Sequence, residues 1–91
     1  MNFSIGQVVI SKAGRDKGKA FIITAIKGEY IYLVDGKCRL LENPKKKKLK
    51  HVQPTWTVDA ALKEALEGQK YIKNADFAAT LKKFGADSKN D

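Results

Sequence analysis

The segment from residue 8 to residue 23 constrains the fold of this 91-residue chain more than any other part. It holds two apolar runs rich in β-branched residues, separated by a loop crowded with cations and glycines. These runs predict two strands, Gln7–Ser11 and residues 20–26, joined by a loop at residues 12–19. Glycine lets a main chain approach a ligand closely, and the loop's cations neutralise phosphate, so we interpret this loop as a binding site for a polyanion.

Further short strands follow the first two. The composition of Tyr30–Val34 predicts a third strand, and the Asp35-Gly36 pair is a hairpin signal that leads to a fourth at residues 38–41. Residues 42–48 have the composition of an exposed basic loop, and residues 49–52 are expected to form a short fifth strand that Pro54 ends. Short strands joined by tight turns favour a small barrel.

After Pro54 the apolar pattern changes to helical spacing. The stripe of the first predicted helix comprises Val58, Ala61, Leu62, Ala65 and Leu66. We expect Thr57 or Asp59 to cap its start and Gly68 to end it in the left-handed conformation. Asn74 is the predicted N-cap of a second short helix that ends at Gly85. The predicted organisation is thus a barrel at residues 1–55, a helical extension at 56–85 and a disordered tail at 86–91.

The net charge of +8 lies entirely in the strand-rich part of the chain. Residues 1–53 carry twelve lysines and arginines against four acids, whereas residues 54–91 carry six of each sign. This asymmetry predicts a directed positive potential, which is typical of a protein that binds a polyanion.

Several classes of protein are disfavoured by the composition. No stretch approaches the roughly 20 apolar residues that cross a bilayer, and the N-terminus has no basic region followed by an apolar one, so we expect a cytoplasmic protein. A single cysteine, Cys38, and a single histidine, His51, exclude an intrachain disulfide and a Cys/His zinc site. The spacing of Gly14, Gly18 and Lys19 departs from that of a nucleotide-binding P-loop. With no catalytic constellation evident, we expect neither enzymatic activity nor a metal or cofactor.

Residues 6–19, followed by Phe21, resemble the KOW motif of ribosomal proteins and transcription elongation factors, with Gly18 at the place of its most constant glycine. The segments 11–18, 35–39, 44–47 and 50–55 are together similar to the type-fourteen large-subunit ribosomal proteins of archaea and eukaryotes. They are more similar still to short bacterial KOW-domain RNA-binding proteins. The resemblance covers about residues 5–55 and implies a five-stranded SH3-like barrel.

The sequence therefore predicts a non-catalytic RNA-binding protein, ribosome-associated or similar to a ribosomal protein. Two basic loops, at residues 12–19 and 44–50, are expected to straddle the sugar-phosphate backbone of ribosomal RNA, and ribosomal proteins are possible further partners. Arg15 and Arg39 are the candidates for base selectivity, because a guanidinium can pair with a guanine edge. The predicted RNA-binding residues are Lys12, Gly14, Arg15, Lys17, Gly18, Lys19, Lys37, Arg39, Lys45, Lys46, Lys47, Lys48, Lys50 and His51.

Each feature also has a simpler interpretation. The glycines of the first loop permit a tight turn, and the lysine run is compatible with a solvated edge that discourages strand pairing. Tyr30, Tyr32 and Trp56 offer faces on which bases could stack, but packing of the tyrosines over the barrel and of Trp56 at the first helix is the alternative. Alternative functions are a transcription-type KOW module on RNA polymerase or DNA, an SH3-like protein-interaction domain, and a binder of acidic membrane surfaces.

Overall fold

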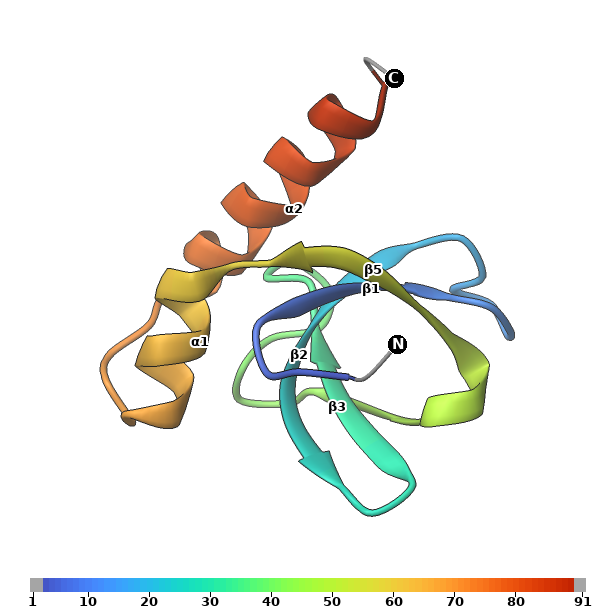
Figure 1. Cartoon of the computed structure of the whole chain (residues 1–91), viewed down its shortest axis with the longest axis horizontal. Coiled ribbons are helices and arrows are strands. Elements are labelled where there is room, and N and C mark those ends of the chain that lie inside the picture. Colours follow the sequence, from blue (N-terminus) through green and yellow to red (C-terminus); the bar gives the residue numbers. More distant parts are fainter. Residues whose placement is uncertain (1–2, 90–91) are drawn as a thin grey trace.

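The computed structural model describes residues 3–89 and shows a five-stranded antiparallel sheet packed against two helices (Figure 1). In chain order the elements are β1 (Gln7–Ser11), β2 (Ala20–Lys27), β3 (Tyr30–Val34), β4 (Lys45–Lys48), a 3-10 helix (Leu49–His51), β5 (Val52–Val58), α1 (Ala60–Glu67) and α2 (Asn74–Lys89). The strand order is β4-β3-β2-β1-β5, so β4 and β5 are the two edges of the sheet. No helix in this described range is long and apolar enough to span a membrane.

The sheet carries apolar side chains on both faces because successive residues of a strand point to opposite sides. On one face, residues of β1, β2 and β3 pack against the two helices; this cluster contains Val8, Ile22, Val34, Leu62, Ile72 and Phe77. The sheet bends around the other cluster, which contains Val9, Phe21, Ile23, Ile31, Leu33 and Val52 (Figure 1). The helices therefore cover one face of the sheet and do not cover the loop between β1 and β2 (Figure 1).

The first three strands are confirmed close to their predicted positions, but the predicted fourth strand at residues 38–41 is wrong. The Asp35 carboxylate accepts hydrogen bonds from the backbone N–H groups of Lys37, Cys38 and Arg39 at 2.9, 2.9 and 2.8 Å. These bonds fold the segment into a tight turn. The fourth strand is formed instead by Lys45–Lys48, which the sequence predicts to be an exposed loop.

The last strand also begins and ends later than predicted. Leu49–His51 is a turn of 3-10 helix, and β5 runs through Pro54, which lies opposite Val9, as far as Val58. Proline is tolerated here because β5 is an edge strand. The register shifts between Gln7 and Val9, and the predicted packing of Trp56 is wrong, since its side chain is 88% exposed. The sheet thus extends beyond the expected boundary at residue 55.

Asp59 caps α1, as predicted, and also joins the two helices. Its Oδ1 accepts a hydrogen bond from the Leu62 N–H at 3.0 Å, and its Oδ2 accepts one from the Thr80 hydroxyl of α2 at 2.7 Å. Burial opposes ionisation of Asp59, but these hydrogen bonds outweigh it and lower the pKa of the carboxyl. Gly68 follows the helix with a φ of −87°, so the predicted left-handed conformation falls one residue later, on Gln69 at 55°.

The second helix begins at Asn74, but the Asn74 side chain bonds to the loop before β4. Its Oδ1 accepts from the Leu41 N–H at 2.8 Å, and its Nδ2 donates to Glu42 at 2.9 Å. The helix comes so close to Gly36 that a Cβ there would collide with the Asn74 carbonyl and with Ala78. It continues past Gly85 to Lys89 and projects beyond the sheet (Figure 1). Residues 86–89 of the predicted tail are therefore helical, and residues 90–91 lie outside the described range.

Candidate nucleic-acid interface

The four consecutive lysines of β4 point alternately to the two faces of the sheet. Lys45 and Lys47 pair with Leu33 and Ile31 of β3, whose side chains are buried in the second apolar cluster. Lys46 and Lys48 pair with Tyr32 and Tyr30 on the opposite face. Strand pairing therefore splits one lysine run into an inner pair and an outer pair, which a loop would not do.

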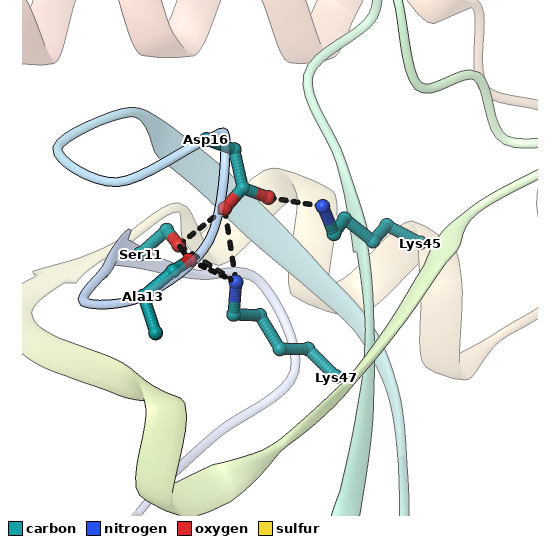
Figure 2. A network of polar contacts seen from close by, with 5 residues as sticks. All are labelled: Ser11, Ala13, Asp16, Lys45 and Lys47. Carbon is teal, nitrogen blue, oxygen red and sulfur yellow. Dashed lines mark hydrogen bonds and ion pairs between the residues drawn. The ribbon is translucent and has the colours of Figure 1, made fainter.

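The inner pair of lysines converges on Asp16, a buried carboxylate from the loop between β1 and β2 (Figure 2). The Lys47 ammonium lies 2.9 Å from Asp16 Oδ1 and also donates to the Ser11 hydroxyl and the Ala13 carbonyl, each at 2.8 Å. The Ser11 hydroxyl is 2.6 Å from the same Oδ1, and the Lys45 ammonium pairs with Oδ2. We call these five residues the Asp16 network.

The Asp16 network is a charged cluster that is largely withdrawn from water. Burial opposes ionisation of Asp16, but hydrogen bonds from Lys45, Ser11 and Lys47 outweigh that effect and hold its pKa well below the usual range. The Lys47 side chain is only 9% exposed and the Lys45 side chain 27%. The carboxylate therefore stays charged at neutral pH and fixes the loop at residues 12–19 against β4.

One groove, which we call the arginine groove, opens beside this network. Its cationic walls come from the first loop, the Asp35 turn and β4, and Phe21 and Cys38 also line it. The cationic residues that line it are Arg15, Lys19, Arg39 and Lys45. Asp16 and Asp35 line it as well, but Asp16 is held by its two lysines and Asp35 by three backbone N–H groups.

A second groove, the tyrosine groove, has Lys45 in common with the first, so the two are neighbours on one surface. It is lined by Ala13, Gly14, Tyr30, Lys45, Lys46, Lys47, Lys48 and His51. The Lys46 ammonium lies 4.3 Å from the centre of the Tyr30 ring and the Lys48 ammonium 5.9 Å from it. Both are within the range of a cation–π interaction.

Nine of the predicted RNA-binding residues therefore line these two adjacent grooves. The predicted residues outside the grooves are Lys12, Lys17, Gly18, Lys37 and Lys50. All five are exposed to solvent. Side chains of both basic segments, residues 12–19 and 44–50, thus line these two grooves.

The structure corrects the role of Lys47 and adds two residues to the site. Lys47 is predicted to contact phosphate, but its ammonium is engaged with Ser11, Ala13 and Asp16 inside the protein. Ser11 and Asp16 are absent from the predicted set, although they hold the interface together. A signal existed for Asp16, because it is the one acid among the four cations of the loop at residues 12–19.

Residues 3–89 include no group of three histidine, cysteine, aspartate or glutamate side chains arranged to hold a metal ion. A scan against models of known protein families and a search of curated proteins found no match to the chain.

Proposed function

We propose that this chain is a non-catalytic RNA-binding protein whose sheet is an SH3-like barrel of the KOW type. The sugar-phosphate backbone of an RNA strand lies across the arginine and tyrosine grooves, and ribosomal RNA is the expected ligand. The observation that carries the proposal is the Asp16 network, because it fixes two cationic segments that are about 30 residues apart in sequence onto one surface.

The charge balance of the surface supports a polyanionic ligand. Asp16 neutralises only one of its two lysines, so the network keeps a net positive charge. Five more cationic side chains line the grooves and form no ion pair with any residue in the described part of the chain: Arg15, Lys19, Arg39, Lys46 and Lys48. Such a cluster binds a phosphate backbone by releasing condensed counterions.

The similarity of residues 5–55 to KOW-domain proteins supports RNA over other polyanions, and it supports a ribosome-associated, cytoplasmic role. The same similarity is also compatible with a transcription-type KOW module that binds RNA polymerase or DNA. Co-sedimentation with ribosomal particles that is abolished by ribonuclease but not by deoxyribonuclease favours the ribosomal role, and the opposite sensitivity favours the transcription-type module.

A second candidate function, an SH3-like protein-interaction domain, is favoured by one observation. Trp56 and Tyr71 expose 88% and 85% of their surfaces, and aromatic side chains are enriched at protein interfaces. A protein partner recognised through these aromatic side chains should bind equally well after the charges of the grooves are reversed.

The test compares two double charge reversals of equal net charge. Lys19→Glu/Arg39→Glu removes two cations of the arginine groove, and Lys73→Glu/Lys82→Glu removes two exposed lysines of the helical part. We expect the first variant to bind a fluorescein-labelled oligoribonucleotide at least about tenfold more weakly in anisotropy titrations, and the second to bind almost as the parent does. Equal losses in both variants would show that net charge, and not the grooves, governs binding.

A further inference from the structure

Among residues 3–89, two aromatic side chains line the basic grooves, Phe21 and Tyr30, and Phe21 is buried. Tyr30 is half-buried at the start of β3 and forms part of the wall of the tyrosine groove. Lys48 lies directly opposite it on β4 and Lys46 lies diagonally opposite, and both ammonium groups lie over its ring. Two like charges thus lie close to one aromatic ring, with no described acid paired to either of them.

We propose that the tyrosine groove is a subsite for an unpaired nucleobase, which stacks on Tyr30 while Lys46 and Lys48 bind the phosphates on either side of it. The inference rests on the proposed RNA-binding function and adds the class of ligand, a single-stranded segment. A base within a duplex is already stacked and paired, and so cannot occupy the ring without being extruded.

Relative interaction strengths favour the exchange of an ammonium group for a base. A solvent-exposed cation–π contact is worth a factor of about 2–5 in an equilibrium constant, whereas stacking of one base on an aromatic side chain is worth roughly 5- to 150-fold. The two contacts at Tyr30 together are worth a factor of about 4–25, so base stacking outweighs both of them in the upper part of its range. The displaced ammonium groups remain beside the base, where its phosphates lie.

The main chain at Gly14 also forms part of the groove wall. Gly14 lines the groove without a side chain, and a Cβ placed there would meet only Asp16 Oδ1 at 3.7 Å and the Lys47 ammonium at 3.9 Å. The other exposed or half-exposed aromatic residues are placed differently. Tyr32 has the Lys27 ammonium 5.3 Å from its ring but does not line either groove, and neither Trp56 nor Tyr71 lines a groove.

The test separates bases from phosphates. The probes are an oligoadenylate of about eight nucleotides and an abasic strand with the same number of phosphates, both titrated into the full chain at one salt concentration. We expect the oligoadenylate to bind roughly 5- to 150-fold more tightly than the abasic strand. When affinity is compared per phosphate contacted, a duplex of the same sequence should bind no more tightly than the abasic strand.

Variants of the aromatic residues assign the effect to one ring. Tyr30→Thr removes the ring but keeps a residue type that is favoured in strands, and should abolish the preference for bases, whereas Tyr30→Phe should retain it. Trp56→Thr removes an exposed aromatic residue outside the grooves and should leave the preference unchanged. Circular dichroism establishes that each variant is folded, and the wild-type comparison of the two probes does not depend on any variant.

The possible failures are distinguishable. If wild-type protein binds both single strands equally and with normal salt dependence, the stacking subsite is refuted while the RNA-binding function stands. If the preference for bases survives Tyr30→Thr or is lost in Trp56→Thr, Tyr30 is not the stacking residue. If neither strand binds at low salt, both the subsite and the proposed function are refuted.

Discussion

Replacing Asp16 by asparagine tests the element that holds the interface together. Asparagine has nearly the same shape, so the substitution removes the negative charge and little else. The Lys47 ammonium would keep its bonds to Ser11 and Ala13 but would lie in a buried position without a counter-charge. Lys45, whose side chain is 27% exposed, can turn towards water.

The expected loss follows from the burial of the lysine that remains. Breaking a buried ion pair by removing one partner costs about 3–5 kcal/mol, and we take the lower end, about 3 kcal/mol, because Lys47 lies on an edge strand. That is a large share of the roughly 5–15 kcal/mol by which domains are stable. For a chain of this length it corresponds to a fall in Tm of about 12–24 °C.

Urea denaturation followed by far-ultraviolet circular dichroism measures the loss. Fluorescence is unsuitable, because Trp56 is already 88% exposed in the folded state. Lys47→Met should cost less than Asp16→Asn, since Asp16 would keep Lys45 and Ser11 as partners. The double variant Asp16→Asn/Lys47→Met should recover part of the stability lost in Asp16→Asn, because no buried lysine is then left unpaired. A loss below about 1 kcal/mol for Asp16→Asn, or a greater loss for Lys47→Met, would refute this reasoning.

Acid unfolding provides a second measure of the same carboxylate. The pKa of Asp16 is lower in the folded protein than the value of about 3.9 expected in the unfolded chain. Its contribution to stability is therefore fully present above that unfolded value and is lost as the pH falls towards the folded pKa. The free energy of unfolding should decline less steeply below about pH 4 in Asp16→Asn than in the parent protein. Equal slopes would show that Asp16 is not held in its charged form by the fold.

Two further predictions concern the packing of the helices. Gly36→Ala places a Cβ against the Asn74 carbonyl at a φ of +79° and should lower stability by about 3 kcal/mol. The control is Gly18→Ala, at a φ of +88°, where a Cβ would have nothing within 4 Å. It should cost only the backbone strain, about 1–2 kcal/mol. Thermal melting distinguishes them, and equal losses would contradict the close approach of α2. Asp59→Ala removes the cap of α1 and the hydrogen bond from Thr80, and should lower stability by about 1–2 kcal/mol. Thr80→Ala spares the cap and should therefore lower stability less. The reverse order of the two losses in urea titrations would contradict the capping role.

Strands that carry apolar β-branched residues could be predicted from the sequence, because their own composition determines their structure. This holds for β1, β2 and β3. Strand β4 could not, because Lys45–Lys48 has no apolar residue, and its extended structure depends on pairing with β3 and on the Asp16 carboxylate beneath it. The Asp35-Gly36 pair was predicted to form a hairpin, but the Asp35 side chain takes up the N–H groups that a following strand would need.

The candidate site could be predicted in its location but not in its internal organisation. Charge asymmetry alone places the cations in the strand-rich part of the chain. It does not reveal that alternate residues of β4 point inwards, and so Lys47 was predicted to face the ligand. The pairing of Asp16 with lysines about 30 residues away is a long-range contact, which no local pattern encodes.

The salt dependence of RNA binding tests the central claim most directly. Five cationic side chains that form no ion pair within residues 3–89 line the two grooves, and each phosphate contact on a single strand contributes about 0.7 to the slope of log affinity against log salt. We predict a slope of about −3.5 for the wild-type protein and about −2 for Lys19→Glu/Arg39→Glu, measured by anisotropy between about 50 and 200 mM salt. A slope near zero, or one that is unchanged by the double reversal, would contradict the account.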